Sequence, residues 1–203
     1  MDIYKQKSQQ SFDLQAAEYD NNYCGQHARK LYPFILEQVR LFQPTNILDL
    51  GCGTGELIVQ ILQRYDDAKL HGIDLSKGML AVAEQKLQGQ AELVHGDSQD
   101  LPYSDESMDM IICNDSFHHY PQPSAVISEI HRVLKPQGVL VIGDCYQPLL
   151  TRWIMNFYMK FSNDGDVKIY SKKEFVSLLS EHFTKIHWEK VNAVSCIVAA
   201  IKD

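Results

Sequence analysis

The stretch ILDLGCGTGEL, residues 47–57, leads from an apolar run into three glycines at alternate positions. A short apolar run of this kind is typical of a buried strand. The glycines Gly51, Gly53 and Gly55 allow a tight turn whose backbone a ligand can approach closely, and the start of a following helix favours an anionic group. We therefore expect a strand, a ligand-binding turn and a helix, in that order.

The spacing of these glycines argues against a dinucleotide. The dinucleotide fingerprint is G-x-G-x-x-G, whereas this turn is G-x-G-x-G and has Glu56 where the third glycine would fall. Asp49 and Glu56 add negative charge, which suits a ligand with an ammonium group better than one with two phosphates. Asp74, 23 positions after Gly51, is expected to end the next strand and to accept hydrogen bonds from ribose hydroxyls. The alternatives are a turn without a ligand and a capping or solvated role for Asp74.

Short apolar runs alternate with helix-length segments as far as Asp144. This alternation implies parallel pairing with right-handed crossovers, so we predict a single α/β domain, residues 1–203, with an open, mostly parallel sheet and helices on both faces. Two further strand-like runs meet around Asn192 and predict a C-terminal antiparallel hairpin, which brings the sheet to seven strands. The pattern places strands at 46–50, 69–74, 91–97, 108–115 and 138–144, and helices at 27–42, 55–67, 76–87 (with Ser76 as N-cap), 123–134 and 171–183 (with Ser171 as N-cap).

Residues 145–170 interrupt the alternation with an apolar and aromatic segment. Trp153, Phe157, Tyr158 and Phe161 form a stripe at helical spacing, which is compatible both with core packing and with a lid. Because ligands on such sheets bind outside the carboxyl ends of the strands, where this segment lies, we expect it to be a substrate-side insertion or lid.

Composition excludes several classes of protein. The 203 residues carry 19 Lys plus Arg against 26 Asp plus Glu, and a net charge of −7 opposes a tight grip on nucleic acid. The five cysteines are scattered and form no C-x-x-C pair, which indicates neither a disulfide framework nor a zinc site. No signal peptide and no window of ~18 apolar residues are present. We expect a cytoplasmic protein without a membrane span, monomeric or homodimeric.

Four ordered motifs carry a resemblance to a known family. The segments ILDLGCGTGEL, GIDLSKGML, HGDSQDLPYSDESMDMIICNDSFHHY and EIHRVLKPQGVLVIGD follow one another in the chain. Together they resemble the Rossmann-like class I S-adenosylmethionine-dependent methyltransferases, in particular the group (methyltransferase type 11 domain) that includes the ubiquinone and menaquinone biosynthesis methyltransferases. The resemblance covers residues 10–144 well and the terminal hairpin more loosely.

The resemblance implies a site for S-adenosylmethionine, with S-adenosylhomocysteine as the product. In relatives the glycine turn holds the methionine end, the acid after the second strand, here Asp74, holds the ribose, and the acid after the third, here Asp97, accepts from the adenine amino group. An N-terminal helical region, here residues 1–45, closes over the cofactor. The matching positions are Tyr19, Tyr23, Asp49, Gly51, Cys52, Gly53, Gly55, Asp74, Leu75, Met79, Gly96, Asp97, Ser98, Asn114 and Ser116. The alternatives are helix packing for Met79 and a capping role for Asp97.

His118 and His119 follow the fourth predicted strand. A neutral histidine in the pocket can accept a proton from a substrate hydroxyl, so both are candidate bases or substrate contacts; the alternative is packing at a helix start. No metal site is expected, because adjacent side chains rarely point to one site and no H-x-x-x-H pattern follows.

These features predict methyl transfer to a small molecule by in-line displacement. Holding both reactants in line accounts for ~7–11 kcal/mol of barrier, whereas a base adds a factor of about 10² to 10⁴, so cofactor residues are expected to matter most. A protein that binds or senses S-adenosylmethionine without catalysis is the alternative. Nucleic acid amino-methylation is disfavoured because Asn114 is not followed by two prolines and an aromatic residue, and a nicotinamide dehydrogenase is disfavoured by Glu56. The methyl acceptor and the atom methylated stay open.

Overall fold

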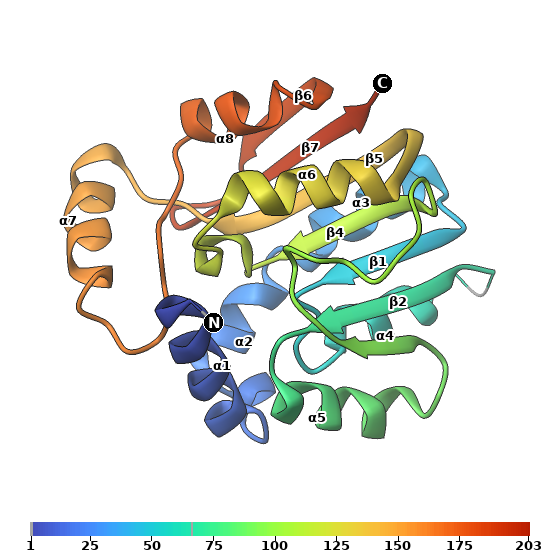
Figure 1. Ribbon diagram of the computed structural model, residues 1–203, viewed down its shortest axis with the longest axis horizontal. Coiled ribbons are helices and arrows are strands. Elements are labelled where there is room, and N and C mark those ends of the chain that lie inside the picture. Colours follow the sequence, from blue (N-terminus) through green and yellow to red (C-terminus); the bar gives the residue numbers. More distant parts are fainter. Residues whose placement is uncertain (1, 66) are drawn as a thin grey trace.

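The computed structural model describes residues 2–65 and 67–203 and forms one seven-stranded sheet in the order β3-β2-β1-β4-β5-β7-β6 (Figure 1). Strands β1 to β5 pair in parallel, and β7 runs antiparallel to both β5 and β6. The strands are β1 Asn46–Leu50, β2 Lys69–Asp74, β3 Glu92–His95, β4 Met108–Asn114, β5 Leu134–Cys145, β6 Phe183–Lys190 and β7 Ser195–Lys202. The predicted open, mostly parallel sheet with a C-terminal hairpin is confirmed.

Helices cover both faces of the sheet, as predicted. Buried side chains of α3, α4 and α5 form one apolar cluster with the sheet, and those of α6 and α8 form the other. The carboxyl ends of the parallel strands point toward α1, α2 and α7, which lie together at one end of the molecule in Figure 1. The helices are α1 Ile3–Gln15, α2 Tyr23–Arg29, α3 Tyr32–Phe42, α4 Glu56–Leu62, α5 Lys77–Leu87, α6 Pro123–Val133, α7 Leu149–Met159 and α8 Lys172–Leu179, with short 3-10 helices η1 Tyr19–Asn21 and η2 Phe117–His119.

Local chemistry sets the start of the predicted helices. Ser76 caps α5 by accepting a hydrogen bond from the Met79 N–H. Ser171 and Glu174 form a reciprocal capping box at the start of α8. Both serines therefore cap the helices for which the sequence proposed them.

The single helix predicted over residues 27–42 is wrong, because two helices occupy this range. α2 ends at Arg29 and α3 begins at Tyr32, with Pro33 in its first turn. Proline lacks a backbone N–H and is tolerated only in the first turn of a helix, so the chain restarts there.

The aromatic stripe of residues 145–170 is not core. α7 buries none of its residues, and the exposed fractions of Trp153, Phe157, Tyr158 and Phe161 are 71%, 51%, 66% and 72%. The inner side of α7 instead supplies Met155 and Met159 to a cavity described below.

Within residues 2–65 and 67–203 there is no helix of the length and apolarity needed to cross a membrane. All five cysteines are free thiols, in agreement with the scattered cysteine pattern.

We predict that Gly55→Ala destabilises the fold more than Gly89→Ala. Both glycines have positive φ values, 72° and 82°, so each substitution forces an L side chain into the left-handed region at about 1–2 kcal/mol. A Cβ at Gly55 would also lie 3.0 Å from Leu87 Cδ1 and 3.1 Å from Ala83 Cβ. A Cβ at Gly89 would have no atom of the described residues within 4 Å, apart from those of its chain neighbours. Urea denaturation should show an additional loss of ~1 kcal/mol or more at position 55. Equal losses would show that the packing of α4 against α5 tolerates the extra methyl group.

Candidate functional site

The turn after β1 has a left-handed backbone at all three glycines, with φ values of 76° at Gly51, 53° at Gly53 and 72° at Gly55. L side chains rarely adopt this conformation. At Gly51 a Cβ would also lie 2.2 Å from the Ser116 Oγ, whereas a Cβ at Gly53 would meet open space. Gly51 and Gly53 line a cavity, here named the turn cavity, so the turn presents bare backbone to whatever lies there.

The backbone holds the carboxylate of Asp74 at the end of β2. Its Oδ2 accepts the Gly53 N–H at 2.8 Å and its Oδ1 accepts the Ser76 N–H at 2.8 Å. Burial raises the pKa of Asp74, and the hydrogen bonds from the backbone N–H groups act in the opposite direction. The carboxylate lines the turn cavity and keeps free lone pairs, so it can accept further hydrogen bonds from two hydroxyls.

Most of the sequence-predicted cofactor residues meet around the turn cavity. They come from the ends of β1 to β4, from the first turn of α5 and from the segment before α2, which the topology brings to one edge of the sheet. The predicted residues that line the turn cavity are Tyr19, Gly51, Gly53, Asp74, Leu75, Met79, Gly96, Asp97, Ser98, Asn114 and Ser116.

Four predicted cofactor residues do not line this cavity. Gly55 is the N-cap of α4 and packs against α5. Cys52 is buried, and a Cβ at Gly72 on β2 would lie 2.9 Å from its Sγ. Asp49 is buried within β1, and Tyr23 is 72% exposed at a different cavity.

The two acids beside the glycine turn differ from each other in their electrostatic setting. The Glu56 Oε2 lies 3.2 Å from the Lys86 Nζ, so the negative charge that the sequence assigned to the ligand site is paired with a lysine. Asp49 is only 3% exposed, and burial, followed by the charge of Asp74, raises its pKa to about 7. A cation bound at the turn would favour the ionised form of Asp49.

Helix α1 covers the turn cavity. The sequence predicted a covering N-terminal region, but it did not indicate which residues of α1 face the cavity. The Lys5 Nζ lies 2.5 Å from the Asp97 Oδ2 and 2.7 Å from the Gln99 Oε1. The Asp13 Oδ1 accepts hydrogen bonds from the Ser76 hydroxyl and the Gly78 N–H at 2.6 and 2.9 Å. The further residues of the turn cavity that were not predicted as site residues are Lys5, Ser8, Gln9, Phe12, Leu50, Ile73, Ser76, Asp115 and Tyr120. The sequence offered only weak signals for these residues. Phe12 is an aromatic residue in a polar segment, and the acid Asp115 directly follows Asn114.

A second cavity of about 360 Å³, here named the histidine cavity, adjoins the turn cavity. Four residues line both cavities: Phe12, Tyr19, Asp115 and His119. The remaining wall includes His118, residues of α2, and residues of the segment 145–170 such as Met155 and Asp166. The structure therefore brings the region predicted to be a substrate-side insertion to a cavity beside the glycine turn.

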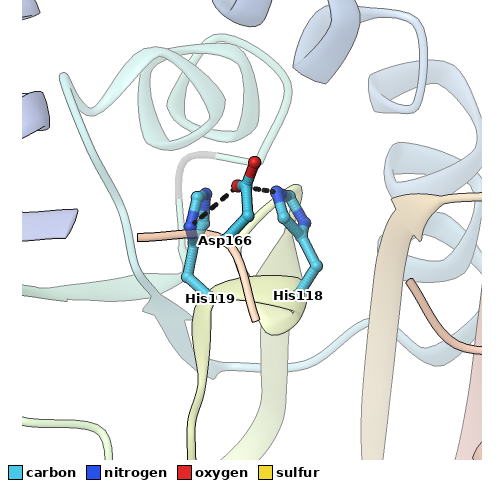
Figure 2. Close-up of side chains that lie close together, drawn as sticks. All are labelled: His118, His119 and Asp166. Carbon is cyan, nitrogen blue, oxygen red and sulfur yellow. Dashed lines mark ion pairs between the residues drawn. The ribbon is translucent and has the colours of Figure 1, made fainter. Parts of the chain in front are cut away.

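The imidazoles of His118 and His119 both point toward the carboxylate of Asp166 (Figure 2). The Asp166 Oδ1 lies 3.7 Å from the His118 Nε2 and 3.3 Å from the His119 Nδ1. The expectation that adjacent histidines point to different sites is therefore wrong here. The short 3-10 helix η2 and the loop that follows α7 bring the three side chains together.

The two histidines have opposite electrostatic settings. Burial disfavours the charged form of His118, but the neighbouring Cys145 and Asp144 outweigh this effect, so the pKa of His118 lies well above its ordinary value. Burial and the charge of His118 place the pKa of His119 well below its ordinary value. His119 is therefore the neutral imidazole of the pair at neutral pH.

Asp115 connects the two cavities to the C-terminal hairpin. Its Oδ2 lies 2.8 Å from the His27 Nδ1, and the His27 Nε2 lies 3.1 Å from the Ser195 Oγ. Hydrogen bonding to Asp115 raises the pKa of His27, against the effect of burial. The Asp115 Oδ1 is buried, has no hydrogen-bond partner among the residues that the structure describes, and is an available acceptor at the junction of the cavities.

Residues 48–142 match the family model of a methyltransferase domain. This part of the chain is similar to a methyltransferase domain. It resembles the class I S-adenosylmethionine-dependent methyltransferases, as the four sequence motifs indicated. A curated relative, the demethylmenaquinone methyltransferase of Oceanobacillus iheyensis, is 37% identical over 121 residues, which cover 56% of this chain and 51% of the relative. The chain thus spans about half the length of that relative.

Two solved structures have the same fold as this chain. The YcgJ protein of Bacillus subtilis aligns with a TM-score of 0.73 at 17% identity and covers 87% of this chain and 98% of its own. The phosphoethanolamine N-methyltransferase 2 of Haemonchus contortus, solved with S-adenosyl-L-methionine, aligns with a TM-score of 0.69 at 18% identity and covers 82% of this chain and 51% of its own. At these identities the likeness establishes the fold.

We predict that His27→Ala lowers the free energy of unfolding by about 3 kcal/mol, because it leaves the Asp115 carboxylate buried and unpaired. The double variant His27→Ala, Asp115→Asn should recover part of this loss, since the uncompensated charge is then removed. Chemical denaturation of the two single variants and the double variant measures the coupling. Additive losses would show that the two side chains act independently.

Proposed function

We propose that this chain is an S-adenosylmethionine-dependent methyltransferase that transfers a methyl group to a small-molecule acceptor. The observation that carries the proposal is the junction of the two cavities at Phe12, Tyr19, Asp115 and His119. One cavity presents the glycine turn and Asp74 to a donor, and the other is of a size suited to a small molecule. The name of the Oceanobacillus iheyensis relative supports a small-molecule acceptor.

The residues around the turn cavity fit the donor. The bare backbone at Gly51 and Gly53 receives the methionine end, and the carboxylate of Asp74 accepts both ribose hydroxyls. Leu75 and Met79 supply apolar surface for the adenine. Asp97 accepts the adenine amino group only after Lys5, its present partner, gives up part of this contact.

When bound, S-adenosylmethionine supplies a methyl group on a positively charged sulfur. The chain contributes mainly by holding donor and acceptor in line, because positioning accounts for ~7–11 kcal/mol of such a barrier. The residues at the junction of the cavities would hold the acceptor so that its reacting atom takes up the methyl group as the carbon–sulfur bond breaks, with the electron pair left on the sulfur. An acceptor that carries a proton on its reacting atom passes it to a group facing the junction, either the carboxylate of Asp115 or the neutral imidazole of His119.

A binding measurement tests the donor assignment. Asp74→Ala should weaken S-adenosylmethionine binding by about 10- to 100-fold, the effect of losing hydrogen bonds to a charged acceptor. Glu84→Ala removes the same charge from an exposed position on α5 and should leave the affinity unchanged. Isothermal titration of the two variants and the unmodified chain gives the comparison, and failure of the unmodified chain to bind would reject the proposed donor.

The affinity for S-adenosylmethionine should rise with pH below neutrality. Asp49 has a pKa of about 7 and is mostly protonated at pH 5.5, whereas a cationic ligand favours its ionised form. Binding therefore releases a proton, and affinity should increase by about tenfold from pH 5.5 to pH 7. Asp49→Asn should bind weakly with little pH dependence. An unchanged pH profile in this variant would assign the dependence to a different group.

The competing function is a protein that binds S-adenosylmethionine without catalysis. Methyl transfer from labelled donor to a panel of quinols, phenols, amines and carboxylic acids separates the two. Donor binding with no methylated product from any acceptor class would favour a protein that binds S-adenosylmethionine without catalysis.

A further inference from the structure

Three ligand-type side chains converge on the wall of the histidine cavity. One nitrogen of His118, one nitrogen of His119 and one carboxylate oxygen of Asp166 all lie within 4.8 Å of one another. The Asp166 Oδ1 lies 3.7 Å from the His118 nitrogen and 3.3 Å from the His119 nitrogen. For metal–ligand bonds of ~2.1 Å, neighbouring ligand atoms lie ~3.0 Å apart in an octahedral site and ~3.4 Å apart in a tetrahedral one. The three side chains are thus close to the spacing of a metal site.

Backbone hydrogen bonds hold this arrangement in place. The carbonyl oxygen of His118 accepts the N–H groups of Val167 at 2.9 Å and Lys168 at 3.1 Å, which fixes the loop that carries Asp166 beside η2. The His119 N–H donates to the Ser116 carbonyl oxygen at 3.0 Å. Because the backbone sets the three positions, an ion would need only small side-chain movements to be bound.

A second observation comes from His119. Its side chain is 10% exposed, and its Nδ1, 3.3 Å from the Asp166 Oδ1, makes no hydrogen bond of good geometry within the described residues. A buried imidazole nitrogen with only this carboxylate beside it is better satisfied by an ion placed between the two groups. Figure 2 shows the ring turned toward Asp166, so the free nitrogen lies on the side where an ion would sit.

The orientation of the His118 ring also suits metal binding. Its Nδ1 lies 2.5 Å from the Asp144 Oδ1, and Asp144 is itself fixed by accepting the Cys145 N–H at 2.7 Å. A carboxylate on one imidazole nitrogen orients the ring, and a metal that displaces the proton from the other nitrogen binds there, which is a recurrent arrangement around ligating histidines. The Nε2 of His118 is the nitrogen that faces Asp166.

We propose that His118, His119 and Asp166 bind a divalent transition-metal ion of the Zn²⁺ class at the wall of the histidine cavity. Two histidines and one carboxylate suit such an ion and leave at least one coordination position for another ligand. Since all three residues line the cavity, this position faces the space assigned to the acceptor. Its use in methyl transfer rests on the proposed function: an oxygen of the acceptor binds there, and the ion lowers the pKa of a bound hydroxyl, whose proton passes to Asp115 or to solvent.

An alternative ligand set shares His118 but uses Asp144 and Cys145. In that set the His118 Nδ1 would have to give up its hydrogen bond to Asp144. The set with Asp166 requires no such loss, so the geometry favours it. The variant Cys145→Ser separates the two sets, because it removes a ligand atom from the alternative set alone.

Metal binding to the full chain tests the proposal without any assay of methyl transfer. Zn²⁺ titration against a chromophoric chelator should show one equivalent bound per chain, and Co²⁺ should give visible bands of a site with nitrogen and oxygen ligands. His118→Ala, His119→Ala and Asp166→Asn should each weaken Zn²⁺ binding by tenfold or more. Circular dichroism checks that each variant folds, and Asp166→Asn preserves the size of the side chain should the alanine variants fail.

Two controls make the outcome decisive. His187→Ala removes a histidine that is 72% exposed and outside both cavity walls, and it should leave the affinity unchanged. Cys145→Ser should change the affinity far less than Asp166→Asn does. Absence of stoichiometric binding, or binding that survives Asp166→Asn and is lost in Cys145→Ser, would overturn the proposed ligand set. Asp166→Asn should keep its affinity for S-adenosylmethionine, so a failure of the metal site and a failure of the donor assignment give different results.

Discussion

The hydrogen bond from the Gly53 N–H to the Asp74 carboxylate is the interaction on which the site depends. It joins the turn after β1 to the end of β2, and it forms only because glycines allow three left-handed backbone positions in five residues. The parallel register of β1 with β2 and β4 then brings Leu75, Asn114 and Ser116 to the same edge. The turn and the strand register together align residues that lie more than sixty positions apart in the chain.

Much of this edge could be predicted because local pattern determines it. Alternating strands and helices imply a parallel sheet, whose carboxyl ends meet at one side, so residues after each strand converge there without any knowledge of long-range contacts. The serine caps of α5 and α8 are likewise local. The break before Pro33 was also visible in the sequence, but the apolar periodicity across residues 27–42 masked it.

What the sequence did not predict depends on contacts between distant segments. Lys86 pairs with Glu56 across two helices, and nothing near Glu56 in the chain announces this partner. Asp166 reaches the histidine pair from a loop nearly fifty residues later, held by hydrogen bonds to a backbone carbonyl that any residue type offers. Backbone acceptors leave no trace in composition or spacing, so the carboxylate partner of His118 and His119 was overlooked.

Helix α1 has a consequence for the kinetics of the proposed reaction. It buries none of its own residues and is held over the turn cavity by a few polar contacts, chiefly those of Lys5 and Asp13. A segment with so little buried apolar surface opens at low free-energy cost and on a faster timescale than the sheet beneath it. In the proposed enzyme, replacement of spent cofactor would require the thirteen residues of α1 to detach, and ionic strength, which weakens the Lys5 contact, would then set the residence time.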